Sequence, residues 1–369
     1  MKNLEQKYPG IGAFWEEMGR TPQNPSFHGE GDVLTHTRLV VEALAKLESF
    51  HRLPRIQREI LFLATALHDA GKPITTRLED GAWVSPHHGR AGAQLVRSFL
   101  WKDCGLCGTP EKQTFREGVC SLIRHHTLPV HAFQREDGVL QLARFAEFPA
   151  TTQMLCLLAE ADILGRIAPD IQELREQVLL TAALAEENGC LTTPMEFVSN
   201  TTKRAWFSGR NVHPCQPLYD DTWGEVILMS GLPGTGKDTW IQNNCAFPMI
   251  SLDEIRRELG IAPTKNQMPV VREARQRAKE LLRKKQRFVW NATDLTLLVR
   301  RKQIDLFESY GASVRIVYLE TDWQTNRERN RNREAVVPEE SLEKMLSIME
   351  PPSPWEARTV EWITGENAQ

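Results

Sequence analysis

The sequence predicts a multidomain protein in which an all-α helical domain is followed by an α/β domain with a parallel sheet. Three observations favour this fold class. The chain has 369 residues, a length typical of two domains. Apolar residues recur at helical spacing over residues 33–190, without convincing strand alternation. After residue 223, short apolar runs alternate with helical segments, which indicates a parallel sheet covered on both faces.

The helical domain is expected over residues 1–190. Val33, Val40 and Leu44 recur at helical spacing and predict its first long helix. Gly71 stops a second apolar stripe that begins near residue 56. Further helical stretches cover about residues 91–101, 115–126, 151–167 and 171–187.

A proline-rich stretch at residues 191–222 is interpreted as a connector between the domains. Trp206 and Phe207 favour a packed connector over a free linker. The α/β domain is expected over residues 223–369. Its strands are predicted at about residues 226–229, 288–290 and 314–319, with helices at about 270–287 and 297–310.

Composition places few limits on function. Residues 1–222 carry 23 Lys and Arg against 27 Asp and Glu, a net charge of −4, and residues 223–369 carry 22 against 21, a net charge of +1. Any nucleic-acid site must therefore be local. The seven cysteines are scattered and include one isolated Cys104-Gly-Leu-Cys107, which lacks a second pair at zinc-finger spacing.

The N-terminal residues lack the apolar core of a signal peptide, and no apolar run approaches the length that spans a bilayer. Together with the odd number of cysteines, this predicts a cytoplasmic protein with no membrane partner. Oligomeric state is left open.

Histidines and aspartates of the helical half predict a metal site. His68 and Asp69 stand at the end of the second helix, where adjacent side chains can reach one ion. His36 lies on an earlier helix, and Asp162 would project into the core from a later one. A buried carboxylate needs a counter-charge, which a divalent cation on these four residues supplies. A lone histidine on a helix is usually structural or exposed, but chance explains an ordered series poorly.

Further histidines suit a second ion beside the first. His88 and His125 are the expected ligands, although their neighbours His87 and His126 leave both choices open. Two ions about 3.5–4 Å apart suit the hydrolysis of a phosphate ester. A histidine-rich set of ligands favours Mn, Co, Ni or Cu over Mg.

These residues resemble the HD-domain phosphohydrolase superfamily, and most of all the HD domain appended to bacterial CCA-adding tRNA nucleotidyltransferases. The resemblance covers about residues 30–170 and rests on Glu30-Gly-Asp-Val-Leu-Thr-His-Thr37, Leu67-His-Asp-Ala-Gly-Lys72, His88-Gly-Arg-Ala-Gly-Ala93, Leu122-Ile-Arg-His-His126 and Ala159-Glu-Ala-Asp-Ile-Leu-Gly-Arg166. It implies one metal on His36, His68, Asp69 and Asp162, a second served by His88 and His125, and catalytic roles for Asp69 and Lys72. Lys72 would touch the scissile phosphate. The superfamily often has Gly-His-Glu where this chain has His87-His88-Gly89.

A glycine-rich loop, Gly231-Leu-Pro-Gly-Thr-Gly-Lys237, opens the α/β half. It follows a strand and precedes a helix, as a phosphate-binding loop must. Its backbone N–H groups and Lys237 are expected to hold the phosphates of ATP or another NTP, with binding residues Gly231, Gly234, Thr235, Gly236 and Lys237.

The position after Lys237 is normally Ser or Thr, which helps to hold Mg²⁺. This chain has Asp238 there, followed by Thr239. Either residue could take that role, with Mg²⁺ or Mn²⁺ as the ion.

Three features favour a kinase over a motor or a switch. Asp253 lies just past a strand-like stretch, where its carboxylate can accept the proton of an attacking hydroxyl. Arg256, one helical turn later, could orient a phosphate of the acceptor. The alternative is an N-capping Asp with a surface Arg.

The second feature is an arginine-rich run over residues 327–333. Arginines four apart line one helix face, so Arg329 and Arg333 can clamp triphosphate oxygens as part of a lid. The third is Asn291-Ala-Thr-Asp294, which follows another strand at the mouth of the same cleft.

Residues 223–349 resemble the P-loop 5′-hydroxyl polynucleotide kinases of the phage T-four type. The resemblance implies Lys237 on the ATP phosphates, Asp253 as general base, Arg256 on the acceptor phosphate, and Arg329 and Arg333 in the lid. Asp238 departs from the Ser of those kinases. The order of the two halves matches the bacterial HD-Pnk family of end-healing enzymes.

The resemblance implies that the helical domain hydrolyses 2′,3′-cyclic phosphate and 2′- or 3′-phosphate ends, and that the kinase phosphorylates a 5′-hydroxyl end of RNA or DNA. Two alternatives stand beside it: a small-metabolite kinase fused to a nucleotide phosphohydrolase, and a hydrolase gated by a nucleotide-sensing domain. Residues 270–287 hold eight basic and two acidic residues, which we interpret as a solvated helix face with Val271 and Leu281 in its buried stripe. A stripe that binds nucleic-acid phosphates is the alternative.

Overall fold

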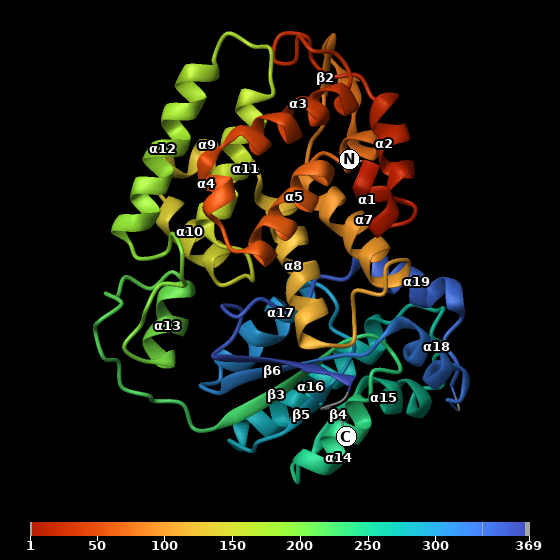
Figure 1. Ribbon diagram of the computed structural model, residues 1–369. Coiled ribbons are helices and arrows are strands. Elements are labelled where there is room, and N and C mark those ends of the chain that lie inside the picture. Colours follow the sequence, from red (N-terminus) through yellow and green to blue (C-terminus); the bar gives the residue numbers. More distant parts are fainter. Residues whose placement is uncertain (1, 334, 366–369) are drawn as a thin grey trace. The chain divides into compact units, whose positions relative to one another are not determined.

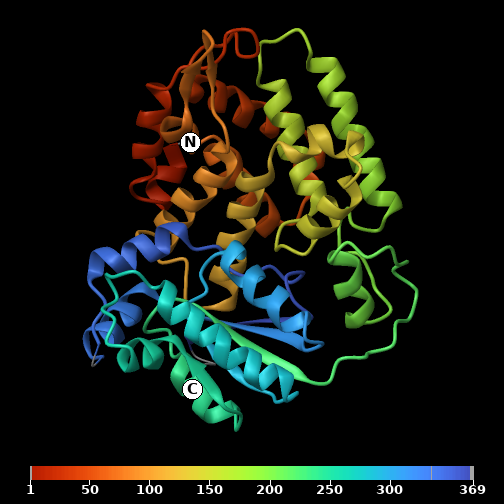
Figure 2. The same ribbon diagram turned by 180° about the vertical axis from the view of Figure 1, so that it is seen from behind.

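The computed structural model describes residues 2–333 and 335–365. The chain divides into two compact units, Met1–Cys107 with Glu111–Glu196, and Gly108–Pro110 with Phe197–Gln369. The first is helical and the second is an α/β unit (Figures 1 and 2), which confirms the predicted fold class. The expected connector, residues 191–222, is shared between the units, and helix α13 (Asn200–Phe207) of the second unit lies within it.

The helical unit is built from helices α1 to α12. Their bounds are α1 Lys2–Lys7, α2 Ile11–Gly19, α3 Val33–Lys46, α4 Glu48–Arg52, α5 Arg55–Leu67, α6 Lys72–Thr75, α7 His88–Lys102, α8 Pro110–His125, α9 Leu128–His131, α10 Gly138–Ala146, α11 Thr152–Leu164 and α12 Ile171–Glu187, with a 3₁₀ turn at Ala132–Gln134. Helix α3 packs against both α5 and α11. Its buried face carries His36 between Val33 and Val40, because these positions share one face of a helix. The apolar stripe therefore brings His36 into the core.

A short hairpin interrupts the helices, where the sequence had shown no convincing strand alternation. Strands β1 (Arg77–Glu79) and β2 (Ala82–Val84) pair antiparallel around Asp80 and Gly81. Both turn residues have positive φ, 49° and 81°. Asp-Gly is a strong signal for such a two-residue turn, so this hairpin was readable from the sequence.

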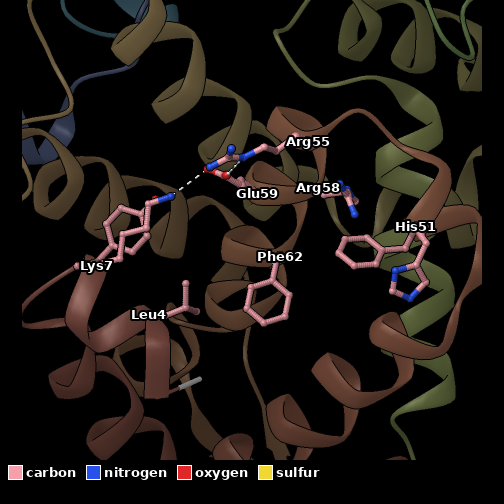
Figure 3. Close-up of a pocket in the computed structure, with 9 residues that line it drawn as sticks. Leu4, Lys7, His51, Arg55, Arg58, Glu59 and Phe62 are labelled. Atoms are coloured by element: carbon pink, nitrogen blue, oxygen red, sulfur yellow. Dashed lines mark hydrogen bonds and ion pairs between the residues drawn. The ribbon is translucent and has the colours of Figure 1, made fainter.

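A cavity of about 430 Å³ lies at the N-terminal end of α5. Figure 3 shows the side chains that line it. Apolar side chains of α1 and α4 line it together with the first turns of α5. Lys7 and Arg55 both pair with Glu59 at its edge, each at 2.9 Å. The cavity thus lies at the end of α5 opposite to His68.

The α/β unit contains a five-stranded parallel sheet in the order β4-β5-β3-β6-β7. Its elements are β3 Glu225–Ser230, α14 Lys237–Asn244, β4 Met249–Ser251, α15 Leu252–Glu258, α16 Met268–Arg283, β5 Val289–Asn291, α17 Leu297–Glu308, β6 Ser313–Glu320, α18 Trp323–Arg331, α19 Glu339–Ile348 and β7 Thr359–Thr364. Strand β7 has no counterpart among the predicted strands.

Alternate residues of the central strand β3 face two different cores. Val226 and Leu228 pack with α15, α16 and α17, whereas Ile227 and Met229 pack with α14. Burial on both faces explains why β3 has a continuous apolar run. In Figure 2, α16 lies across the sheet.

The buried stripe of α16 differs from the predicted one. Val270 and Leu282 are buried, and the predicted Val271 and Leu281 are only half-buried. Helical periodicity predicted the spacing of the buried residues but not which residue of each adjacent apolar pair is buried. These pairs, at both ends of the stripe, are 270–271 and 281–282.

Candidate active sites

Four histidines of the helical unit are oriented by a bond at Nδ1. His68, His88 and His126 each lie 2.8 Å from the backbone carbonyl three residues earlier, at Thr65, Ser85 and Ile123. A carbonyl only accepts, so each Nδ1 carries the proton and each Nε2 keeps its lone pair. His36 has the carboxylate of Glu30 at 2.8 Å from its Nδ1. This is the orientation that metal-binding histidines adopt.

The carboxylate of Asp69 lies between these rings and is 1% exposed. Its Oδ2 is 3.3 Å from His68 Nε2 and 4.0 Å from His36 Nε2. Its Oδ1 is 3.5 Å from His88 Nε2 and 3.9 Å from His126 Nε2. Each oxygen therefore faces two imidazole nitrogens, and Asp69 with these histidines would hold divalent cations.

Asp162 completes the group from helix α11. Its Oδ1 is 3.0 Å from His36 Nε2, and Arg166 binds its Oδ2 at 2.9 Å. Burial alone would raise the pKa of Asp162, but Arg166 and His36 hold this pKa well below its ordinary value. Burial likewise acts to raise the pKa of Asp69, which the charges of Lys72 and His68 keep well below the usual range. Both carboxylates are therefore ionised.

Several buried polar atoms of the cluster lack a hydrogen-bond partner among the described residues. These atoms are His36 Nδ1, His68 Nε2 and both carboxylate oxygens of Asp69. His36 Nδ1 and Asp69 Oδ2 have ion-pair contacts instead, with Glu30 and Lys72 at 2.8 Å each. His88 Nε2 and His126 Nε2 lie 3.1 Å apart with their lone pairs facing each other. Buried groups of this kind are normally satisfied, so the arrangement fits divalent cations. Three overlapping groups of possible ligands lie here: His28-Glu30-His36, His36-His68-Asp69 and Asp69-His88-His126.

The structure places five of the six predicted ligands together and corrects the sixth. His125 lies outside the cluster, because its ring packs against Phe145 and Phe148 at centroid distances of 5.5 and 5.7 Å. His126, just beyond the end of α8, takes its place. Of the two neighbours that the sequence left open, His126 and not the expected His125 therefore lies in the cluster.

His87 and His88 are also separated by the structure. His87 is exposed and has a left-handed backbone with φ of 57°, whereas His88 begins α7 and faces Asp69. Burial lowers the pKa of His88, and it lowers the pKa of His126 to about 3. Both rings are thus neutral, as metal ligands must be.

Lys72 lies beside the cluster. Its Nζ is 2.8 Å from Asp69 Oδ2 and donates to Gln23 Oε1 at 2.7 Å. An ammonium at this position can bind a phosphate oxygen, while divalent ions would supply a Lewis acid for phosphate-ester hydrolysis. Sequence reasoning did not assign roles to Gln23, His28, Glu30 or Arg166, although the last two stand in the quoted motifs.

In the α/β unit, the glycine-rich loop joins β3 to α14. Gly231, Gly234 and Gly236 all have positive φ, 139°, 84° and 95°. A Cβ on Gly231 would lie 2.4 Å from the carbonyl oxygen of Leu319, so no other residue fits there without a backbone shift. Thr235 is buried within the loop. The loop thus holds a conformation that exposes backbone N–H groups at a helix N-terminus.

Lys237 folds back over this loop and donates to the carbonyls of Gly231 and Leu232 at 2.9 and 2.8 Å. Burial lowers the pKa of Lys237 to about 8. The charges of Asp238, Arg333 and Asp253 also act on it, which places the four groups in one electrostatic neighbourhood.

Asp253 lies in the first turn of α15, directly after β4. Ser251 caps this helix by accepting from the N–H of Glu254, so Asp253 is not the N-cap. Its side chain is 62% exposed and forms ion pairs with Arg256 and, at 3.6 Å, with Arg333. The alternative of a capping aspartate is thereby excluded, and the carboxylate is accessible to an acceptor.

Asp238, at the predicted magnesium-binding position, hydrogen-bonds to a neighbouring strand end. Asp238 Oδ1 accepts from Asn291 Nδ2 at 2.7 Å, which links the start of α14 to the end of β5. Thr239 is exposed on the next position. Asp294 is buried, accepts from Trp290 Nε1 at 3.0 Å, and has its pKa raised to about 7 by burial. Asp294 is thus a buried acid and not an exposed group of the cleft.

The arginine-rich run is only partly helical. Helix α18 ends at Arg331, so Arg333 lies beyond it and does not share a helix face with Arg329. Arg329 nevertheless lies over the loop, with Nη1 3.6 Å from a Cβ built on Gly236. Asn326 of the same helix donates to the carbonyl of Pro233 at 2.8 Å. The helix is therefore fastened to the loop, and both predicted lid arginines lie near it.

Comparisons with known proteins agree with this division. Residues 33–146 match the HD domain family, and residues 226–352 match the family described as AAA domain. The chain combines an HD domain with a P-loop kinase-like domain. It is similar to a gluconokinase from Sinorhizobium meliloti 1021, with 18% identity, a TM-score of 0.29, and coverage of 39% of this chain and 84% of that one. No curated protein matches the chain.

Among the helices in the described part of the chain, none is long and apolar enough to span a membrane.

Proposed function

We propose that this protein heals broken nucleic-acid strands at both ends. The HD domain would hydrolyse 2′,3′-cyclic phosphate ends and then the resulting monoester, and the P-loop domain would phosphorylate 5′-hydroxyl ends. In the first reaction, water adds to phosphorus as one ring P–O bond breaks, and a second water removes the phosphate. In the kinase reaction, the 5′ oxygen attacks the γ-phosphorus of the NTP, NDP leaves, and a base accepts the proton of the hydroxyl.

The observation that most supports the kinase is the environment of Asp253. Its exposed carboxylate contacts Arg256 and Arg333 and acts electrostatically on Lys237. A general base beside a phosphate-binding lysine suits transfer to a hydroxyl. A nucleotide sensor needs neither the base nor the arginines that would hold an acceptor phosphate.

The hydrolase assignment is supported by the two sides of Asp69, each facing a pair of imidazole nitrogens. Such a site suits a phosphate ester that carries two non-bridging oxygens. One strand break with a 5′-hydroxyl and a cyclic phosphate would supply a substrate to each domain. Mn, Co, Ni or Cu ions are proposed for the HD site, and Mg²⁺ or Mn²⁺ with the NTP.

The test is a 5′-hydroxyl, 2′,3′-cyclic-phosphate oligoribonucleotide incubated with ATP and Mn²⁺, with both ends followed. We expect D253A to abolish 5′ phosphorylation and spare 3′-end hydrolysis, and D69A to do the reverse. A matched DNA strand compares the two nucleic acids. A 3′-mononucleotide phosphorylated as efficiently as the oligonucleotide would favour the small-metabolite alternative. Loss of both activities in either folded variant would contradict the two-site assignment.

A further inference from the structure

Glu30 is a buried carboxylate that the chemistry above does not use. It lies in the loop before α3, and its side chain is 1% exposed. Oε1 lies 2.8 Å from His36 Nδ1 and 2.9 Å from His28 Nδ1, and Oε2 accepts from the N–H of Ile167 at 2.9 Å. Two imidazole nitrogens and one backbone N–H, from three parts of the chain, thus converge on one carboxylate.

These contacts tie together the segments that carry two of the predicted metal ligands. Ile167 follows α11, which holds Asp162, and its carbonyl accepts from the N–H of Gly29 at 3.0 Å. A Cβ on Gly29 would lie 2.9 Å from that carbonyl oxygen. The close approach of the two backbones therefore depends on a glycine. The hydrogen bond from the N–H of Ile167 to Glu30 stabilises this approach.

His36 differs from the other three histidines in the partner of its Nδ1. The other three histidines donate from Nδ1 to a carbonyl three residues back. His36 lies in the first turn of α3, where the carbonyl of Val33 already accepts from Thr37 Oγ1 and that of Asp32 from the N–H of His36. The carboxylate of Glu30, in the loop before α3, contacts Nδ1 of His36 in place of a carbonyl.

We propose that Glu30 is a positioning residue that fixes His36 as a metal ligand by holding its Nδ1–H, so that Nε2 faces Asp162 and Asp69. The inference rests on the metal site of the proposed hydrolase and not on its substrate. Changes to partners of this kind typically weaken metal binding by about 10–100-fold.

The position of His28 allows a different interpretation of Glu30, which the experiment must distinguish from the proposal. It shares Glu30 with His36, and the two rings meet edge-to-face at 4.8 Å. The three residues could instead hold a cation among themselves. In that case Nδ1 of His36 would be a ligand, and its Nε2 would carry the proton towards Asp162.

Calorimetric titration of the metal-free full chain with Mn²⁺ and with Co²⁺ tests the proposal. The variants are E30Q, E30A, H28A and the control E59Q, which changes a carboxylate of the same unit that pairs with Lys7 and Arg55. We expect E30A to bind about 10–100-fold more weakly and E30Q to fall between it and E59Q, which binds as the wild type does. H28A should keep the same number of ions. Raising the Mn²⁺ concentration should restore hydrolysis of the 2′,3′-cyclic phosphate by E30Q, with kcat returning towards that of the wild type.

Equal affinity of E30Q and E59Q would overturn the proposal, and E30Q serves even where E30A fails to fold. Loss of one ion per chain in H28A would also overturn it, in favour of a separate cation on His28, Glu30 and His36. A wild type that binds neither ion leaves nothing to position and overturns it as well. A wild type that binds Mn²⁺ but leaves the cyclic phosphate intact would contradict the proposed substrate alone.

Discussion

The Nε2 atoms of His88 and His126 face each other at 3.1 Å across the HD site. Each ring donates from its Nδ1 to a backbone carbonyl, so both facing atoms are acceptors. Two lone pairs this close repel, and a divalent cation bound to both nitrogens would remove that repulsion. The pair lies where the sequence predicted a second ion, for which His88 and His125 were the expected ligands.

The first prediction separates the adjacent histidines of α8. H126A should lose one bound Mn²⁺ or bind it at least about tenfold more weakly, because a ligand nitrogen is gone. H125F should keep the wild-type affinity, since this ring already packs against Phe145 and Phe148. Calorimetric titration with Mn²⁺ measures both. The reverse ranking would restore His125 as the ligand.

The second prediction concerns the proposed general base. D253N should lower kcat for 5′ phosphorylation by about 10²–10⁴-fold, because the amide cannot accept the proton. E254Q changes the next carboxylate, which is also exposed, and should remain near wild type. Transfer of the γ-phosphate of labelled ATP to a 5′-hydroxyl strand provides the measurement. A D253N rate within a few-fold of E254Q would remove Asp253 from catalysis.

The third prediction decides between Asp238 and Thr239. Asp238 accepts from Asn291 at 2.7 Å and stands where a phosphate-binding loop normally has Ser or Thr. We expect D238A to need about tenfold more Mg²⁺ for half-maximal kinase activity, and T239V to need no more than wild type. Kinase rates over a Mg²⁺ series test this. A shift confined to T239V would transfer the role to Thr239.

The fourth prediction is a pH effect from Asp294. Burial raises the pKa of this acid to about 7, above the ordinary value of 3.8. The folded state therefore holds a proton that the unfolded state has lost between pH 4 and 7. Its contribution to stability is complete below pH 4 and declines by about 1.4 kcal/mol per pH unit up to pH 7.

D294N should lack this decline, because its amide does not titrate. Its Tm relative to wild type should therefore rise between pH 5 and pH 7.5 in calorimetric scans. D305N changes an exposed aspartate of α17 and should show no such trend. A pH-independent difference between D294N and wild type would mean that Asp294 is ionised in the folded protein throughout.

Local patterns carried most of the secondary structure. The long helices α3, α5, α11 and α12 follow apolar stripes, and β3 and β6 follow continuous apolar runs. Strand β7 was missed because its residues are mostly half-buried at the sheet edge and carry no strong apolar signal. The hairpin at Asp80 and Gly81 was missed although its turn signal was present.

The two candidate sites also differ in how far the sequence predicts them. The loop from Gly231 to Lys237 is contiguous, so its sequence alone predicts its conformation, as the three positive φ angles show. The HD site is assembled from α3, α5, α7, α8 and α11. Spacing could not choose between His125 and His126, because the choice depends on which ring turns inward where α8 ends.

The sequence by itself determined which chemical groups are present: a phosphate-binding loop, an ordered set of histidines and aspartates, and an acid followed by an arginine one turn later. Only the tertiary structure decided which of them meet. The approach of His36 to Asp162 at 3.0 Å, that of His88 to His126 at 3.1 Å, and the Arg333 that reaches Asp253 from beyond α18 are contacts of this kind. Helical period and turn chemistry act over a few residues, whereas the facing of two side chains distant in sequence is set by how the helices that carry them pack.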